Sequence, residues 1–481
     1  MMDVPHSDLQ RRLGPTQVAM MGLGGSLGTG LFLGSGDVLR LTGSGAVLSY
    51  ALTAALAVVV MYAMGEVTAA HPELGGFGAV AHDYLGPLGG FVARWNVVAA
   101  SCIGVGAEVV AAATYLQYWW PDIPLAWGAL GVSVLIAAAN FLAVGIYGRL
   151  GAAMTSIKIA VIAVFILVSA AVVFNRGGGT SVSHATGDLL PRGSLGFFQG
   201  ATVAVFSFGG IEASSVAATE SRDAARTIAK AFRILAVTLV VADVCCLAGI
   251  VALFPQHQTV TGGRQSASPF VRVFSMLNIP AAGSLMNAVL IIASISAALG
   301  LMYAASRMLY SLSGDQLAPT WLHHTNQRAV PWRAVAASSL GMALAVALAV
   351  FRPNDAFRAL AGMLVFGVVI TWTMTLLTHL AQRHLSDARP LIRLPFSPAI
   401  DIVVLLTLWG FAVQLWWIPG FRNALLAGVP YLFVLLVGGW LATRPARLER
   451  LDRQLHVRAS LGVDGYGVVS HGSTELELGD E

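Results

Sequence analysis

A glycine-rich run near the N-terminus, Gly22 to Gly36 (GLGGSLGTGLFLGSG), has the residue types needed to break a helix inside an apolar stretch. Seven of its fifteen residues are glycine, and each glycine costs a helix about 1 kcal/mol relative to alanine. We expect the chain to unwind at its centre, where it would present free backbone amides and the positive ends of helix dipoles to an anion such as a carboxylate. The central residues are Gly25, Ser26, Leu27, Gly28, Thr29 and Gly30.

This run has two other interpretations. The spacing of Gly24, Gly28 and Gly30 imitates a dinucleotide-binding fingerprint, but that motif needs a preceding strand and a following acidic ribose ligand. Neither fits a charge-free stretch that extends from Leu13 to Gly36. Close helix packing through small residues is the second interpretation, and for the outer glycines, Gly34 and Gly36, it is as good as an unwound backbone.

A second segment of the same kind, FSFGGIE, interrupts an apolar helix in the middle of the chain. Paired glycine-interrupted segments at corresponding positions of two halves are the best sequence indication of a transporter binding site. We therefore expect substrate to contact both segments. The residues predicted here are Phe206, Ser207, Phe208, Gly209 and Gly210.

Four ionisable side chains lie within apolar stretches, Lys158, Glu108, Glu212 and Asp243. A charge at a helix centre costs about 2.5–3.5 kcal/mol on insertion scales, so each is a functional candidate. Lys158 either extends to the membrane surface or is buried, where its charged form is disfavoured and it could take up and release a proton in each cycle. It is our candidate for proton coupling.

The three carboxylates each have a structural alternative. Glu108 and Glu212 either take part in function or accept hydrogen bonds from broken backbone. Asp243 either makes a local polar contact or contributes to coupling or selectivity. Glu66, at the end of the second apolar stretch, is expected to be a gate or helix-end contact rather than a ligand.

Composition restricts the class of protein. The 481 residues are 56% hydrophobic and only 11% charged, whereas soluble domains carry about 25% charged residues. This excludes a soluble enzyme, and a net charge of +4 without basic clusters argues against nucleic acid as a partner. Cys102, Cys245 and Cys246 have neither disulfide nor metal spacing, so no metal or cofactor is expected.

Apolar stretches long enough to span a membrane, which takes roughly 20 residues, recur along the chain and predict an all-α polytopic protein. The twelve predicted spans are residues 17–38, 46–65, 91–119, 125–144, 151–174, 195–218, 234–253, 281–309, 334–351, 360–380, 402–418 and 424–443. Twelve spans place both termini on one side. With cytoplasmic termini, nineteen Lys and Arg residues lie inside and eight outside, which is the favoured orientation.

These motifs resemble the amino acid transporter branch of the amino acid–polyamine–organocation superfamily, which includes bacterial permeases for GABA, proline and aromatic amino acids. The resemblance runs from about Leu13 to Arg393 and includes GGSLGTGLFLGSG, GEVTAAHPELGGFGAVAHDYLGP, SIKIAVI and FSFGGIEASSVAATESRD. It implies a LeuT-like core of two inverted repeats of five helices, followed by two peripheral helices, in the bacterial inner membrane.

The resemblance also implies a division of the chain and a set of roles. The segments are a cytoplasmic tail (1–16), a first repeat (17–182), a second repeat (183–393), two further spans (394–443) and a cytoplasmic tail (444–481). Backbone from Ser26 to Gly30 would receive the substrate carboxylate, carbonyls of spans one and six its amine, and Phe208 would cover the site. A lysine at position 158 is implied to couple transport to protons.

The expected function is uptake of an amino acid by alternating access, with the bilayer, substrate and protons as partners and no obligate protein partner. Where branch members often have an Asn-Ser pair, this chain reads Leu299-Gly300, which slightly favours a small or medium neutral substrate. Obligate exchange of amino acids is the first alternative. A sensor that binds without transporting is the second, and a membrane-embedded enzyme is not supported by any metal or nucleophile motif.

Overall fold

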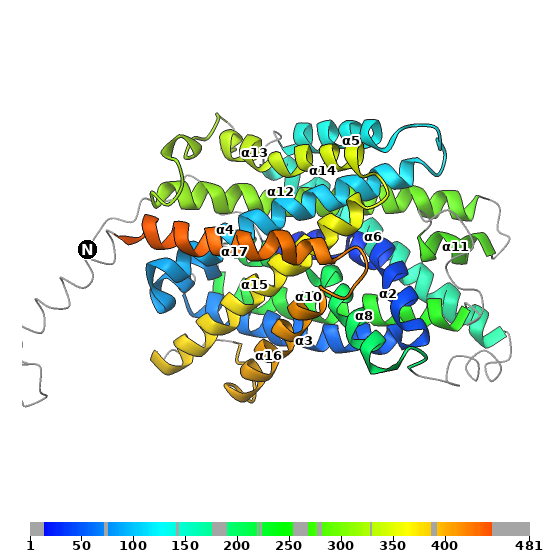
Figure 1. The fold of residues 1–481 in the computed structure, drawn as a ribbon, viewed down its shortest axis with the longest axis horizontal. Helices are drawn as coiled ribbons and strands as arrows, with labels where there is room; N and C mark the ends of the chain where they lie inside the picture. The colour runs from blue at the N-terminus through cyan, green and yellow to red at the C-terminus, as the bar shows by residue number, and fades with distance from the viewer. Residues whose placement is uncertain are drawn as a thin grey trace, which may run out of the picture.

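The computed structural model describes residues 14–71, 76–140, 144–175, 190–218, 221, 224–253, 268–276, 281–327, 330–385 and 392–444. The predicted cytoplasmic tails lie almost entirely outside these residues, as does the predicted repeat boundary at 182/183. Within the described residues the chain is a bundle of helices without extended sheet (Figure 1).

The described residues form a series of helices. In chain order they are α1 (Pro15–Ser26), η1 (Gly30–Gly34), α2 (Ser35–Thr42), η2 (Gly43–Gly45), α3 (Ala46–Ala70), α4 (Phe77–Leu116), α5 (Leu125–Asn140), α6 (Val144–Asn175), α8 (Gly193–Phe208), α9 (Glu212–Ala218), α10 (Ala224–Leu253), α11 (Pro269–Met276), α12 (Ala282–Gly314), η4 (Thr320–Leu322), α13 (Trp332–Ser338), α14 (Leu340–Phe351), α15 (Ala356–Leu385), α16 (Ala399–Gln414) and α17 (Arg422–Ala442).

Each predicted span overlaps helical residues. Among the described residues, nine stretches are long and apolar enough to cross a membrane, the first of which, residues 15–70, takes in α1, α2 and α3 together. The helices α5 and α16 are shorter apolar helices, and α4 begins well before the predicted third span. It bends where Gly86 adopts a φ of 78° just before Pro87, a conformation that favours glycine. The protein is therefore polytopic and helical, while the count of twelve spans stays a prediction.

The outer surface of the bundle is apolar. Large hydrophobic side chains on the outer helices are mostly exposed, including Leu167 of α6, Leu406 of α16 and Phe433 of α17. Soluble monomers rarely expose apolar patches larger than a few hundred Å², so this surface is suited to lipid. In Figure 1, α5, α13 and α14 lie along one side of the bundle and α16 along the opposite side.

Three long helices form the centre of the bundle. The helix α4 packs against α12 and α15, and most of the apolar part of each of these helices is buried. The two broken helices lie within the same packing, because α1 contacts α10, α6 and α12, and α8 contacts α3, α2 and α15. The centre of the bundle therefore positions the two glycine-rich segments singled out from the sequence.

Candidate substrate site at two broken helices

The first break lies between α1 and η1. The α-helix ends at Ser26, and Leu27 turns the chain with φ −73° and ψ 71°. The amide of Gly28 then donates to the carbonyl of Ser26 over 2.8 Å, and helical structure resumes at Gly30 as a short π-helix. The unwound residues are thus Leu27 and Gly28, within the segment predicted from its glycines, and Thr29 already has helical dihedral angles.

The second break lies between α8 and α9. The helix α8 ends at Phe208, after which Gly209 is extended, with φ −64° and ψ 147°. Gly210 has a φ of +97°, which side chains of L-residues rarely adopt. The α9 helix begins at Glu212, so Gly209 to Ile211 form the interruption.

The two breaks are in direct backbone contact. A methyl group added to Gly210 would lie 2.7 Å from the carbonyl carbon of Gly25, and one added to Gly30 would lie 2.5 Å from Cα of Ser207. These distances are too short for a real side chain. The glycines therefore allow one broken helix to cross the other, in addition to breaking each helix.

Buried charges hold the first break from two sides. The Lys158 ammonium on α6 donates to the carbonyl oxygens of Gly24, over 2.8 Å, and Leu27, over 2.9 Å. The Glu108 carboxylate on α4 accepts from the amide of Thr29, at 3.1 and 3.3 Å from its two oxygens. Lys158 is 0% exposed, so it does not extend to the membrane surface.

A third acidic or basic side chain, Glu212, caps the backbone of the second break. The Glu212 carboxylate accepts from the amide of Gly210 over 2.9 Å and is buried. Glu108 and Glu212 thus both make the backbone-capping contacts that the sequence offered as one of two alternatives. These contacts satisfy amides that the interrupted helices leave without an intrahelical partner.

Tyr50 connects the two breaks, and it is not among the residues predicted from the sequence. Its hydroxyl group on α3 lies 3.2 Å from the carbonyl oxygen of Gly30, to which it donates, and 3.1 Å from Oγ of Ser207. A tyrosine inside an apolar span was the available signal, because a buried phenol usually finds a hydrogen-bond partner.

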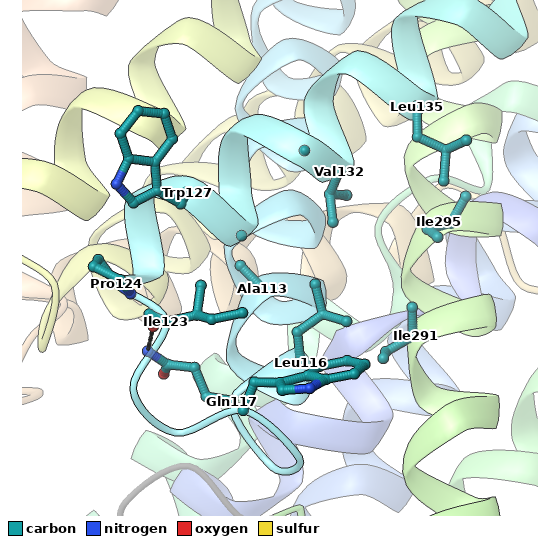
Figure 2. A pocket seen from close by; sticks show the side chains of 13 residues that line it. Ala113, Leu116, Gln117, Ile123, Pro124, Trp127, Val132, Leu135, Ile291 and Ile295 are labelled. Carbon is teal, nitrogen blue, oxygen red and sulfur yellow. Dashed lines mark hydrogen bonds between the residues drawn. The ribbon is translucent and has the colours of Figure 1, made fainter.

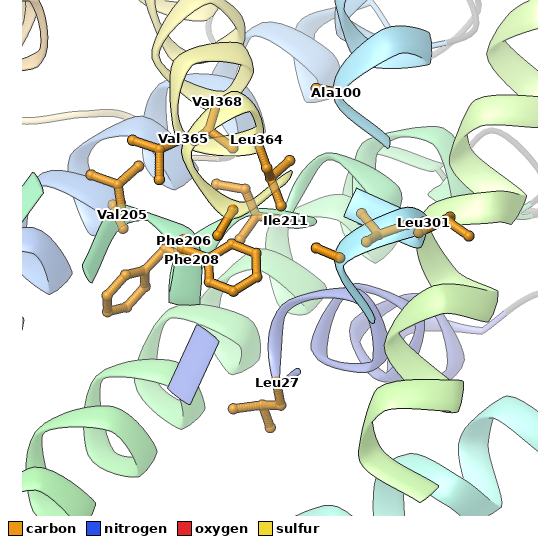
Figure 3. Close-up of a cluster of buried hydrophobic side chains, with 14 of the residues drawn as sticks. Leu27, Ala100, Val205, Phe206, Phe208, Ile211, Leu301, Leu364, Val365 and Val368 are labelled. Carbon is orange, nitrogen blue, oxygen red and sulfur yellow. The ribbon is translucent and has the colours of Figure 1, made fainter. Parts of the chain in front are cut away.

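Aromatic and aliphatic side chains cover the second break. Phe208 is fully buried, and the ring centroid of Phe206 lies 5.8 Å from that of Phe357 in an edge-to-face arrangement. Figure 3 shows the apolar cluster around them, in which side chains of α15 lie above those of the second break. The labelled members from these two elements are Val205, Phe206, Phe208, Ile211, Leu364, Val365 and Val368.

Gly28 and Gly300 both lie in close contact with neighbouring groups. A side chain at Gly28 would collide with Oε1 of Glu108 and approach Cβ of Ala297, so Gly28 faces the capping carboxylate. A methyl group at Gly300 would lie 3.0 Å from Cα of Gly25. Gly300 therefore packs against the first broken helix and leaves no room there for a substrate group.

Asp243 and Glu66 lie outside the two breaks. Asp243 on α10 is 0% exposed, and neither of its carboxylate oxygens has a hydrogen-bond partner within the described part of the chain. The local polar contact offered as one alternative is thus not found among these residues. Glu66 on α3 pairs with Arg383 on α15 at 2.8 Å, which agrees with a helix-end contact.

An apolar groove of about 520 Å³ lies away from the breaks, between the end of α4, α5 and α12 (Figure 2). Trp120 and Trp127 line it and are more than half exposed. Its lining suits hydrocarbon rather than an amino acid, whose carboxylate and amine need polar partners.

An apolar helical bundle with two broken helices in contact at its centre has the architecture of a membrane transporter. The chain belongs to the amino acid permease family, whose profile matches residues 17–451. It is 30% identical over 443 residues to the aromatic amino acid transport protein AroP of Escherichia coli O6:H1, covering 88% of this chain and 96% of that protein. The AroP proteins of Salmonella typhimurium strain SL1344 and Shigella flexneri are also 30% identical, each over 88% of this chain and 95% of the relative.

The family resemblance inferred from the sequence motifs is thereby confirmed. The protein is a multi-pass inner-membrane transporter of the amino acid permease family and is not an enzyme.

Proposed function

We propose that the protein imports a neutral amino acid together with a proton, by alternating access around the two broken helices. The observation that carries this proposal is the buried lysine at the first break. Lys158 donates to the carbonyl oxygens of Gly24 and Leu27, and Glu108 accepts from the amide of Thr29, two residues after Leu27. A change in charge at Lys158 would therefore act directly on the backbone of the predicted substrate site.

The substrate carboxylate would bind amides of the first break, from Ser26 to Gly30, and the amine would bind carbonyls of both breaks. Glu108 already accepts from the amide of Thr29, so the carboxylate must use the other amides of this segment or displace Glu108. Ser26 supports a polar ligand here, because its buried hydroxyl has no hydrogen-bond partner among the described residues. Phe208 would cover the bound substrate.

For the side chain of the substrate, the first class to test is aromatic. The preference for a small or medium neutral side chain rested on Leu299-Gly300 as an apolar pocket wall. Gly300 instead contacts the backbone of Gly25, so this argument loses its geometric basis. The curated relatives are aromatic amino acid transport proteins at 30% identity, which favours an aromatic substrate.

Proton coupling would operate through the hydrogen bonds of Lys158. Charge-assisted hydrogen bonds are roughly twice as strong as neutral ones. Loss of a proton from Lys158 would weaken its hold on Gly24 and Leu27 and leave Glu108 without a counter-charge. The first break could then rearrange and release substrate, which links the proton to the transport step.

The architecture that we infer for this cycle is a core of two inverted five-helix repeats, with residues 394–443 peripheral to it. The pairing of α1 with α8, each broken at its centre, supports this division. The excess of Lys and Arg on one side supports cytoplasmic termini. A fluorescent protein fused to the C-terminus should fold and fluoresce if that end is cytoplasmic, and a dark but inserted fusion would reverse the orientation.

The function is tested by uptake of radiolabelled amino acids into liposomes, with and without an inward proton gradient. The protein is compared with Lys158→Ala, with Lys158→Arg, which keeps the charge but does not release its proton, and with Lys230→Ala as a control on the exposed face of α10. We expect uptake to rise with the gradient in the protein and the control, and to lose this response in both Lys158 variants.

Two other outcomes would contradict the proposal. Uptake that requires only internal amino acid, and ignores both the gradient and Lys158, would make the protein an exchanger. Binding of an amino acid without any uptake would make it a sensor.

A further inference from the structure

Four ionisable side chains meet at one end of α3, α15 and α16, apart from the two breaks. They are Glu66 on α3, His379 and Arg383 on α15, and Asp401 on α16. The helix α15 packs against both α3 and α16, and in Figure 1 α16 lies at the edge of the bundle. The group therefore joins a peripheral helix to the centre of the bundle.

Glu66 is the centre of this group. Arg383 donates to it through Nε, over 2.9 Å to Oε1, and through Nη2, over 2.8 Å to Oε2. The amide of Leu394, in the segment before α16, donates to Oε2 over 2.6 Å. Glu66 is thus a buried carboxylate with a bidentate arginine partner, an arrangement that fixes geometry as well as charge.

His379 lies between two carboxylates. Its Nε2 is 3.1 Å from Oε2 of Glu66, and its Nδ1 is 3.2 Å from Oδ2 of Asp401. Ser397 donates to the same oxygen of Asp401 over 2.5 Å. His379 and Asp401 are both 0% exposed, so water does not mediate or screen these contacts at the surface.

The number of protons in this group follows from its chemistry. A neutral imidazole carries one N–H donor and one lone pair, so one ring nitrogen would turn its lone pair toward a carboxylate oxygen. Two carboxylates and one guanidinium also leave a net charge of −1 in a buried site. One additional proton removes both problems, because an imidazolium carries a proton on both nitrogens, so that Nδ1 can hydrogen-bond to Asp401 while Nε2 faces Glu66 as an ion-pair partner, and it brings the net charge to zero.

We propose that His379 is a proton-binding site whose imidazolium form fixes α16 to the core of the transporter. Glu66 faces the ring from α3 and Asp401 faces it from α16. Arg383, which lies on α15 as His379 does, pairs with Glu66. When the proton leaves, the contact between α15 and Asp401 loses its charge and α16 is held less tightly. Because α15 also packs against α8, this change reaches the helix that carries the second break.

This site is independent of the coupling role given to Lys158, so the two proposals can fail separately. The imidazolium contributes stability at low pH, and this contribution is lost as the pH rises and the ring gives up its proton. Thermal unfolding of the purified full-length protein in detergent, measured across the range of histidine titration, reports this loss directly. A structural role without a bound proton would leave that part of the pH profile flat.

Variants of His379 and Asp401 separate the effect of the net charge of this group from the effect of side-chain packing. We expect His379→Gln to lower the apparent Tm by at least about 5 °C at low pH, because it leaves a buried negative charge uncompensated, and to remove the decline of Tm with pH. Adding Asp401→Asn should restore most of the lost Tm, since the net charge returns to zero. His384→Gln, an exposed histidine on the same helix, is the matched control and should keep the profile of the unmodified protein.

Asp401→Asn alone provides a test if His379→Gln cannot be purified. With one neighbouring carboxylate neutralised, the imidazolium should lose its proton at lower pH, so the decline of Tm should move to lower pH. An unchanged profile in both variants would overturn the proposal. So would an Asp401→Asn variant that is as stable as the unmodified protein at low pH and shows no decline of Tm with pH, because His379 would then not be the group that binds the proton.

Discussion

Lys158 and Glu108 bind the two kinds of backbone group at the first break, a carbonyl oxygen and an amide. The ammonium donates to the carbonyl oxygen of Leu27 over 2.9 Å, and the carboxylate accepts from the amide of Thr29 over 3.1 Å. Two backbone groups that an intact helix would pair internally are thus paired with side chains of opposite charge. The break is stabilised in the apolar interior because both its donors and its acceptors have charged partners.

Glu108 should stabilise the protein in two ways, by accepting from the amide of Thr29 and by balancing the charge of Lys158. Glu108→Ala leaves the amide of Thr29 unpaired and Lys158 without a counter-charge, and we expect a loss of stability of about 3–5 kcal/mol. Glu108→Gln retains an acceptor for Thr29 and should lose less. The measurement is thermal unfolding in detergent. Equal losses in the two variants would show that the capping hydrogen bond contributes nothing of its own.

Gly210 should tolerate no side chain. Gly210→Ala forces a β-carbon to within 2.7 Å of the carbonyl carbon of Gly25 at a φ of +97°, and backbone strain alone costs about 1–3 kcal/mol. We expect uptake to be lost because the two breaks are pushed apart. Gly410→Ala on α16, with open space around its added methyl group, is the control and should retain uptake. Normal uptake by Gly210→Ala would disprove the contact between the breaks.

Tyr50→Phe tests the connection between the breaks. The variant removes the hydroxyl group that lies near Gly30 and Ser207 while keeping the ring, so packing on α3 is preserved. A hydrogen bond contributes about 0.5–1.5 kcal/mol to stability, and we expect a loss within or slightly above that range. Uptake at limiting substrate concentration should fall severalfold. If both stability and uptake stay unchanged, the hydroxyl group does not couple the two segments.

Asp243→Asn should leave the protein as stable as before, or make it more stable. The carboxylate is fully buried and has no hydrogen-bond partner among the described residues, so a charge there has no compensation. Thermal unfolding tests the stability, and the uptake assay with a proton gradient tests function. Reduced coupling in a stable variant would assign Asp243 to transport, whereas a clear loss of stability would mean that the carboxylate has a partner.

Local sequence determined where the helices break. Glycines cost an α-helix stability wherever they occur, and their concentration at residues 22–36 and 209–210 located both interruptions within a few residues. The apolar stretches likewise located the helices, and the motifs around them identified the family. These features depend on residue type and spacing along the chain, so no knowledge of distant contacts was needed.

Tertiary structure decided which groups meet across the bundle. Whether Lys158 reached the surface or the backbone of α1 depended on how α6 packs against α1, and the sequence left both possibilities open. The same holds for Tyr50, whose partners lie 20 and 157 residues away, and for His379, whose two carboxylates come from separate helices. Helix packing sets these contacts between residues far apart in the chain, and a single sequence carries no direct signal of it.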